Sequence, residues 1–209
     1  MVPFSGWNMP VQYTGIIEEH LYTRTRAGLF DICHMGEFII KGPSSVSDLE
    51  RLVTCDIGGM ATGKCRYGLL LNEKGGMIDD LIAFRVSKDE FMLVVNAGTT
   101  QKDRDWIVPR LSEGTSFRDI SDITAKLDLQ GPLSGNIMAS IAGSAAAKVK
   151  ALKRYTFTEL TIDGVKILIS RTGYTGELGY ELFLPAEHAG RFWDKLISHN
   201  TVRPVGLGA

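Results

Sequence analysis

The stretch FIIKGPSSVSDLERLV (residues 38–53) places a short apolar strand, a Gly-Pro turn and a helix in succession. Proline suits the first turn of a helix because its missing N–H would have no partner there. The same order returns in LDLQGPLSGNIMASIA (residues 127–142), where Gly131 follows Gly42 by 131 − 42 = 89 residues. The two Gly-Pro turns therefore predict an internal duplication.

Each Gly-Pro segment is followed by a hairpin, a further strand and a helix. The three segments are YGLLLNEKGGMIDDLIAF, EFMLVVNAG and TQKDRDWIVPRL in the first copy, and FTELTIDGVKILIS, GYELFLP and AEHAGRFWDKLI in the second. Because the order β-α-β-β-β-α occurs twice, we expect an α+β fold with two layers. Boundaries near 41–43 and 121–124 predict a discontinuous domain of residues 1–41 and 123–209. An inserted domain of residues 42–122 carries the GGMIDD hairpin.

The composition is typical of a soluble globular protein. The chain has 209 residues, 44% of them hydrophobic and 22% charged, with a net charge of −1. This near-neutral charge indicates no nucleic-acid partner, and no apolar run reaches the ~18–20 residues that span a bilayer. The three cysteines are odd in number and lack metal-ligand spacing, which favours a reducing compartment. We expect a bacterial cytoplasm, or a mitochondrial matrix if the source is eukaryotic.

Two adjacent acids stand in GGMIDDLIAF (residues 75–84), which otherwise has the pattern of a buried strand. Strand alternation puts Asp80 on a face with only apolar neighbours, and puts Asp79 on the other face, where Arg85 could compensate it. An ionised carboxylate among apolar groups is costly, so Asp80 is a candidate for acid–base or substrate-holding work. The alternative is that both acids are solvated beside the Gly-Gly turn.

Two further motifs contain candidate binding residues. In DICHMGEF, Cys33, His34 and Glu37 lack the further ligands that a metal site needs, so a turn is the simpler interpretation, and Met35 could line a ligand pocket. In RTGYTGELGYEL (residues 171–182), Tyr174 could offer an aromatic face to a flat heterocycle. Glu181 could accept paired N–H donors from the same ring. A plain glycine-rich connection is the alternative.

Seven segments together resemble the aminomethyltransferase (T-protein) family of the glycine cleavage system. They occur in the family's order along the chain, as MVPFSGWNMPVQY, AGLFDICHMGEF, LLLNEKGGMIDDLI, VVNAG, LQGP, SRTGYTGELGYEL and RPVGLGA. The resemblance implies a folate-binding fold with a ferredoxin-like subdomain. It also implies transfer of an aminomethyl group from the lipoyl arm of H-protein to tetrahydrofolate, with release of ammonia and no metal.

The resemblance also assigns residues to the tetrahydrofolate site. Asp80 matches the aspartate beside the reacting nitrogens, where it orients the folate and assists proton movement. Tyr67, Tyr174 and Glu181 match positions that line the pocket, and the glutamate holds the pterin ring. Met35 and Asn96 fall in motifs near the same pocket.

Family members continue beyond this C-terminus, through an arginine of the folate site and into a β-rich domain. We therefore expect a truncated chain that lacks the C-terminal β-barrel domain and has weak or absent turnover. Two other functions fit related domains. One is the folate-binding half of a dimethylglycine- or sarcosine-demethylating enzyme, and the other is a non-catalytic folate-binding protein of iron–sulfur assembly.

Overall fold

The computed structural model describes residues 1–209, which form two compact units. The first unit is discontinuous and comprises Met1–His34 and Ile123–Ala209, whereas the second comprises Met35–Asp122. The second unit thus begins before the strand at residues 36–41, while the sequence predicts a boundary after that strand.

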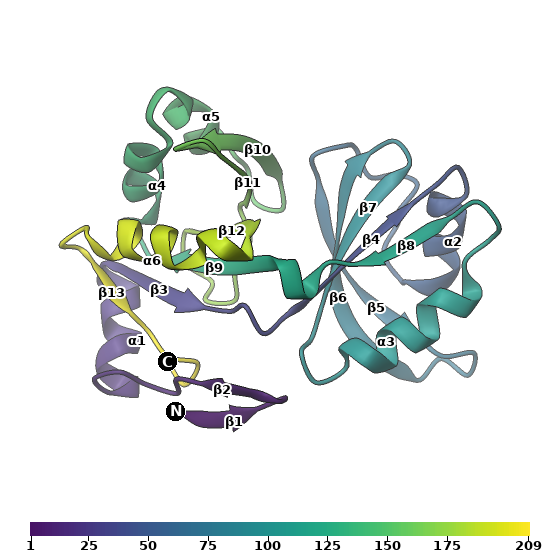
Figure 1. Cartoon of the computed structure of the whole chain (residues 1–209), viewed down its shortest axis with the longest axis horizontal. Helices are drawn as coiled ribbons and strands as arrows, with labels where there is room; N and C mark the ends of the chain where they lie inside the picture. Colours follow the sequence, from purple (N-terminus) through teal and green to yellow (C-terminus); the bar gives the residue numbers. More distant parts are fainter. The chain divides into compact units, whose positions relative to one another are not determined.

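The second unit contains a five-stranded sheet in the order β5-β6-β7-β4-β8 (Figure 1). Its strands are β4 (Gly36–Lys41), β5 (Cys65–Leu71), β6 (Met77–Ser87), β7 (Glu90–Val95) and β8 (Ser116–Asp119). Its helices are α2 (Ser45–Leu52), α3 (Thr100–Ile107) and the 3-10 turns η1 (Val108–Arg110) and η2 (Ser121–Ile123).

Both α-helices of the second unit cover the same face of its sheet. Leu49 and Leu52 of α2 and Ile107 of α3 belong to one core cluster with the inward residues of the strands. Those strand residues are Phe38, Ile40, Leu70, Leu81, Ala83, Phe91, Leu93 and Val95. Residues 81 and 83 of β6 therefore mark its helix-covered side, which decides where each acid of the GGMIDD hairpin lies.

The first unit contains a six-stranded sheet in the order β10-β11-β12-β9-β3-β13, and a separate β1-β2 ribbon. Its strands are β1 (Val2–Phe4), β2 (Trp7–Met9), β3 (Ala27–Asp31), β9 (Thr124–Gln130), β10 (Phe157–Ile162), β11 (Val165–Ser170), β12 (Gly179–Pro185) and β13 (Val202–Pro204). Its helical segments are α1 (Ile16–Thr25), α4 (Ser134–Ala142), η3 (Gly143–Ala145), α5 (Ala146–Lys150), η4 (Ala186–His188) and α6 (Ala189–Ile197). No helix in the chain has the length and apolar character needed to cross a membrane.

The two sheets confirm the predicted duplication and the α+β fold. In the second unit the hairpin β5-β6 is followed by β7 and then by β4, the first strand of the copy. In the first unit β10-β11-β12-β9 has the same order and the same antiparallel pairing. Each copy therefore folds its hairpin and third strand back beside its own first strand.

The repeated glycine is required by the backbone at both turns. Gly42 has φ +152° and Gly131 has φ +124°, values that side chains of L-residues rarely adopt. A Cβ at Gly42 would lie 2.3 Å from the carbonyl oxygen of Gly114, and one at Gly131 would lie 2.4 Å from that of Arg26. In each copy the serine three residues later donates its N–H to the glycine carbonyl at 3.0 Å. The shared Gly-Pro pattern thus encodes one turn, used twice.

Candidate functional site

The more buried acid of β6 is Asp79, whereas the sequence interpretation singled out Asp80 as the acid among apolar groups. Asp79 is 7% exposed and shares its face with Leu81 and Ala83, which pack against the helices. Asp80 is half-buried and points to the opposite face. Alternation separates the two faces correctly, but only the position of the helices shows which face is the core.

Arg85 does not compensate Asp79, contrary to the expectation from alternation. Its guanidinium donates to the backbone carbonyls of Ile57, Gly58 and Met60 and, from the other nitrogens, to those of Ser87 and Lys88. The arginine therefore holds the loop before β5 against the far end of β6.

Asp79 is instead satisfied by neutral donors at the end of β7 and the start of α3. Its Oδ1 accepts the Asn96 side-chain amide at 2.9 Å, and its Oδ2 accepts the Asn96 backbone N–H at 3.2 Å and the Thr99 hydroxyl at 2.6 Å. Burial by itself would raise the pKa of Asp79, but hydrogen bonds from Thr99, Asp103 and Asn96 outweigh it and lower the pKa. Asp79 is therefore an ionised, buried anchor.

Asn96 links this anchor to Asp80 on the other face of the sheet. Its side-chain nitrogen donates to Asp80 Oδ1 at 3.0 Å and to the Asp80 carbonyl at 3.1 Å, in addition to Asp79. The Oδ2 atom of Asp80 accepts no hydrogen bond within the chain, so one oxygen is held and the other is available. Two of the sequence-predicted residues, Asp80 and Asn96, are thus brought together.

Tyr67 lies on the same sheet face as Asp80. It pairs with Ile82 of β6, while Leu69 pairs with Asp80, so Tyr67 is the diagonal neighbour of the acid. The tyrosine is 53% exposed, which leaves its ring open to solvent. Met35 is half-buried at the start of the second unit, just before β4. Tyr67 also has interactions of its own within the chain.

Asp103 is a second buried acid that the sequence interpretation missed. It lies on the sheet-facing side of α3, is 0% exposed, and contacts the Asp79 carboxyl. Burial raises its pKa to about 7, and the adjacent Asp79 adds to the effect. The sequence does contain a signal, because Asp103 stands four residues before the core residue Ile107 and so shares its helix face.

In the first unit Glu181 is buried and already paired. Its Oε1 accepts the Lys126 ammonium at 2.9 Å, and its Oε2 accepts the Thr172 hydroxyl. Asp128 lies directly opposite Glu181 on β9, and burial together with the Glu181 charge raises the pKa of Asp128 well above its ordinary value. A ring bound by Glu181 must therefore share or displace contacts made within the chain.

The buried polar row on β9 also escaped the sequence interpretation. Lys126, Asp128 and Gln130 alternate with the core residues of the strand, and all three are buried. Gln130 donates to Asp128 at 2.5 Å and to the Thr172 carbonyl at 3.1 Å. Polar residues at every second position in AKLDLQ were the available signal.

Tyr174 is fully exposed, at 103% of its reference surface, in the loop between β11 and β12. Arg24 of α1 holds this loop, because it donates to the Thr175 carbonyl at 2.5 Å and to Glu177 at 3.1 Å. Of the sequence-predicted residues, Met35, Tyr67, Asp80 and Asn96 thus belong to the second unit. Tyr174 and Glu181 belong to the first.

Cys33, His34 and Glu37 form no metal cluster, since no group of three or more His, Cys, Asp or Glu side chains in the chain is placed to hold an ion.

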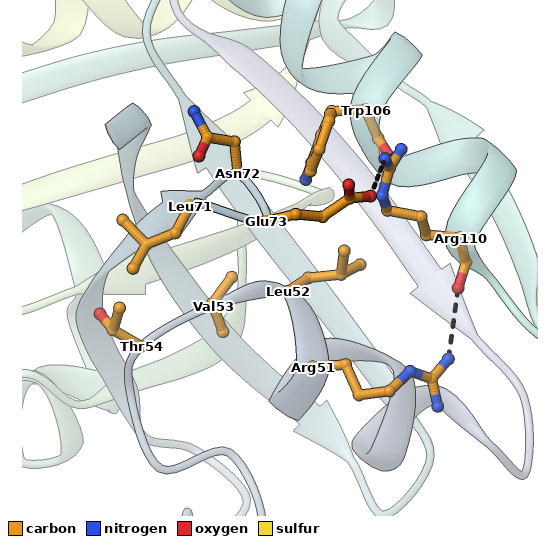
Figure 2. Close-up of a pocket in the computed structure, with 9 residues that line it drawn as sticks. All are labelled: Arg51, Leu52, Val53, Thr54, Leu71, Asn72, Glu73, Trp106 and Arg110. Atoms are coloured by element: carbon orange, nitrogen blue, oxygen red, sulfur yellow. Dashed lines mark hydrogen bonds and ion pairs between the residues drawn. The ribbon is translucent and has the colours of Figure 1, made fainter. Parts of the chain in front are cut away.

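The second unit contains a cavity of about 300 Å³ (Figure 2). None of the sequence-predicted residues lines it. Both apolar and polar or charged side chains line it, namely Arg51, Leu52, Val53, Thr54, Leu71, Asn72, Glu73, Trp106 and Arg110.

Comparisons with known proteins cover the whole chain. The model of one family, described as the GCVT N-terminal domain, matches residues 1–209. Proteins named aminomethyltransferase from Desulforamulus reducens and Halothermothrix orenii are 43% and 41% identical, each over 100% of the chain. The crystal structure of glycine cleavage system aminomethyltransferase T from Bartonella henselae has a TM-score of 0.89 and 36% identity, and also covers 100% of the chain.

The same comparisons show how much of each relative is matched. The chain spans 57% and 58% of the lengths of the two curated proteins and 56% of the Bartonella henselae chain. A heterotetrameric sarcosine oxidase from Corynebacterium shares the fold, with a TM-score of 0.56 and 14% identity. At that identity the likeness concerns architecture alone.

Proposed function

The chain belongs to the GCVT N-terminal domain family, and from that premise we propose that it is the folate-binding part of a glycine cleavage aminomethyltransferase. In the proposed reaction the methylene carbon moves from the lipoyl sulfur of H-protein to two nitrogens of tetrahydrofolate. The sulfur leaves as a thiol, the amino group leaves as ammonia, and 5,10-methylenetetrahydrofolate forms. The two protons lost by the folate nitrogens end on the thiol and on the ammonia.

The half-satisfied carboxylate of Asp80 is the observation that supports this proposal most. One oxygen is held by Asn96 and the other accepts nothing from the chain. A carboxylate fixed in this way can accept an N–H of a substrate without first reorganising, which is the condition for positioning a weakly basic nitrogen. We assign Asp80 the catalytic role of orienting the folate amine and accepting its proton as the new C–N bond forms.

The negative charge of Asp80 has a second use in the proposed reaction. The one-carbon fragment develops positive charge as its bond to sulfur or nitrogen breaks. A fixed anion beside it lowers the energy of that state more than it lowers the energy of the neutral adduct.

The remaining assignments concern ring binding. Tyr67 offers an exposed aromatic side chain on the Asp80 face, suited to the apolar body of a folate. Tyr174 and Glu181 are proposed as further contacts of tetrahydrofolate, supported by the resemblance of their motif. Met35 and Asn96 are proposed as neighbours of the same ligand, with Asn96 acting chiefly by orienting Asp80. Lipoylated H-protein is the proposed partner.

Tetrahydrofolate binding to the purified chain tests the proposal, with ammonia release from aminomethylated H-protein as the second measurement. Asp80→Asn keeps the shape of the side chain and removes the charge. We expect it to weaken tetrahydrofolate binding by about tenfold or more, which corresponds to the loss of one charge-assisted hydrogen bond. Ammonia release is expected to fall further, because the proton acceptor is lost as well.

Glu113→Gln is the matched control, because it removes one negative charge from an exposed position in the same unit. It is expected to leave tetrahydrofolate affinity within about twofold of the parent chain. Failure of the parent chain to bind tetrahydrofolate at millimolar concentration refutes the folate assignment. Equal affinity and equal ammonia release for Asp80→Asn and Glu113→Gln refute the role of Asp80.

A further inference from the structure

The carboxyl groups of Asp79 and Asp103 form a buried pair that the proposed reaction does not touch. Asp103 has no exposed surface, and neither of its oxygens accepts a hydrogen bond from a donor group of the chain. Its polar contact is the carboxyl of Asp79, across the interface between α3 and β6. Two adjacent carboxylates shielded from water cannot both be ionised at low cost, so the pair retains one proton.

The hydrogen-bond donors decide which member of the pair carries that proton. Asp79 accepts three hydrogen bonds, two from Asn96 and one from Thr99, and these stabilise its ionised form. Asp103 has no donor within hydrogen-bond geometry, because the nearby Thr99 hydroxyl, which would also favour its ionised form, is donated to Asp79. The proton therefore resides on Asp103, which donates it to Asp79 as the fourth hydrogen bond to that carboxylate.

The state of the pair reaches Asp80 through a single side chain. The Asn96 amide nitrogen carries two hydrogens, and it lies 2.9 Å from Asp79 Oδ1 and 3.0 Å from Asp80 Oδ1. The Asn96 amide thus connects Asp79, on the helix-covered face of the sheet, with Asp80 on the opposite face. A second negative charge beside Asp79 would draw the amide toward the pair and away from Asp80.

Such a charge would have no directly paired cation, although the nearby Lys102 ammonium favours the ionised form of Asp103. Lys102 of α3 donates its ammonium to the Ile78 carbonyl at 2.5 Å rather than to either carboxylate. Arg110 of η1, which packs against the end of α3, binds Glu73 and the Trp106 carbonyl. Deprotonation of Asp103 therefore adds a charge to the pair that Lys102 offsets from a distance but that no cation binds directly.

We propose that Asp103 is a positioning residue for Asp80: its proton lets Asp79 share the Asn96 amide with Asp80, and loss of that proton frees the Asp80 carboxylate. Asp103 touches Asp79 and not the substrate, so its effect is transmitted entirely through Asn96. The coupling itself is a property of the second unit. Only the step from Asp80 orientation to tetrahydrofolate affinity rests on the proposed function.

The side-chain ¹⁵N–H₂ signals of Asn96 provide a measurement that needs no folate. Between pH 5.5 and 9 we expect these signals to move in the parent chain, with a midpoint near neutral pH. In Asp103→Asn the new amide still donates to Asp79 but cannot ionise, so the Asn96 signals should stay constant. Asp105→Asn, an exposed acid of the same helix that binds Gln101, should behave as the parent does.

Tetrahydrofolate affinity over the same pH range is the second readout. In the parent chain it should weaken by about tenfold from pH 6 to pH 9, the effect of losing one oriented charge-assisted hydrogen bond. In Asp103→Asn it should stay within about twofold. A substitution that only loosened the fold would lower affinity at every pH and would not remove the pH dependence.

The outcomes separate this inference from the proposed function. Asn96 signals that stay constant in the parent chain overturn the coupling, and this measurement needs no variant to fold. Signals that still titrate in Asp103→Asn overturn the role of Asp103. Titrating signals with no tetrahydrofolate binding at any pH support the coupling and refute the proposed function. Titrating signals with pH-independent affinity overturn the step from Asp80 to the folate.

Discussion

Replacing Asp103 by asparagine should make this protein more stable, and the gain should depend on pH. Asp103 is fully buried, and burial beside Asp79 raises its pKa from 3.8 to about 7. Asparagine has nearly the same shape, keeps a donor for Asp79 and cannot ionise. The substitution therefore removes one titration while leaving the hydrogen bond in place.

The sign and size of the effect follow from proton linkage. A carboxyl whose pKa is higher in the folded state binds its proton more tightly there, so the protein loses stability as the pH rises from about 4 to about 7. Above the folded pKa no further loss occurs. The full difference is 1.36 kcal/mol for each unit of pKa, or about 4 kcal/mol for a rise from 3.8 to about 7.

Urea unfolding at half-unit intervals from pH 3.5 to 8.5 measures this difference. The free energy of unfolding of Asp103→Asn minus that of the parent should increase by about 4 kcal/mol between pH 4 and pH 7.5, then level off. Asp105→Asn, on the exposed side of the same helix, should give a flat difference within about 0.5 kcal/mol. The amide introduced by Asp103→Asn replaces the Asp103 hydrogen bond that helps to lower the pKa of Asp79, so the contribution of Asp79 should be similar in parent and variant.

A difference curve for Asp103→Asn that is flat across this range refutes the buried, proton-sharing pair. A difference that falls as the pH rises would mean that the ionised form of Asp103 is the one stabilised by folding. Either result would also remove the physical basis of the coupling between Asp103, Asn96 and Asp80.

Three other substitutions test the fold. Gly131→Ala should lower the free energy of unfolding by about 2–4 kcal/mol, because the added Cβ lies within 2.5 Å of two carbonyl oxygens at φ +124°. Gly190→Ala is the control, since a Cβ there meets nothing, and it should change the free energy of unfolding by less than ~1 kcal/mol. Asp48→Asn should cost about 2–4 kcal/mol at pH 7, because that carboxylate, whose pKa is lowered, binds both polar groups of Ser112. The pKa of Glu19 is also lowered by the four backbone N–H groups that it accepts, so its contribution is present above its ordinary pKa and is lost as the pH falls through the folded value. Urea unfolding of Glu19→Gln should therefore show a deficit at pH 7 that shrinks toward pH 3, and a pH-independent deficit would contradict this account.

The duplication could be predicted from the sequence because its signals are local. A Gly-Pro pair before an amphipathic segment constrains φ and helix entry within a few residues, whatever the rest of the chain does. The hairpins are equally local, and Asp163-Gly164 adopts the left-handed conformations that a two-residue turn requires. Both copies therefore appear in the pattern before any long-range contact is known.

The candidate site could be predicted only in part, because its contacts join residues that are far apart in the sequence. Asp80 and Asn96 could be identified from the motifs that resemble the family, but their hydrogen bond joins β6 to the end of β7 and depends on strand register. The pairing of Glu181 with Lys126 joins residues on two strands of the first sheet, and no local pattern specifies it. Such contacts depend on which strands become neighbours.

The sequence by itself determined the repeated unit, its turns and the alternation that separates Asp79 from Asp80. Only the tertiary structure decided which of these two acids is buried, because the choice depends on the side of the sheet that α2 and α3 cover. The shifted pKa of Asp103 has the same origin, since it arises from the packing of α3 onto β6 and from the removal of water between two carboxyl groups. Alternation is a property of one strand, whereas burial and charge coupling are properties of the surfaces that meet.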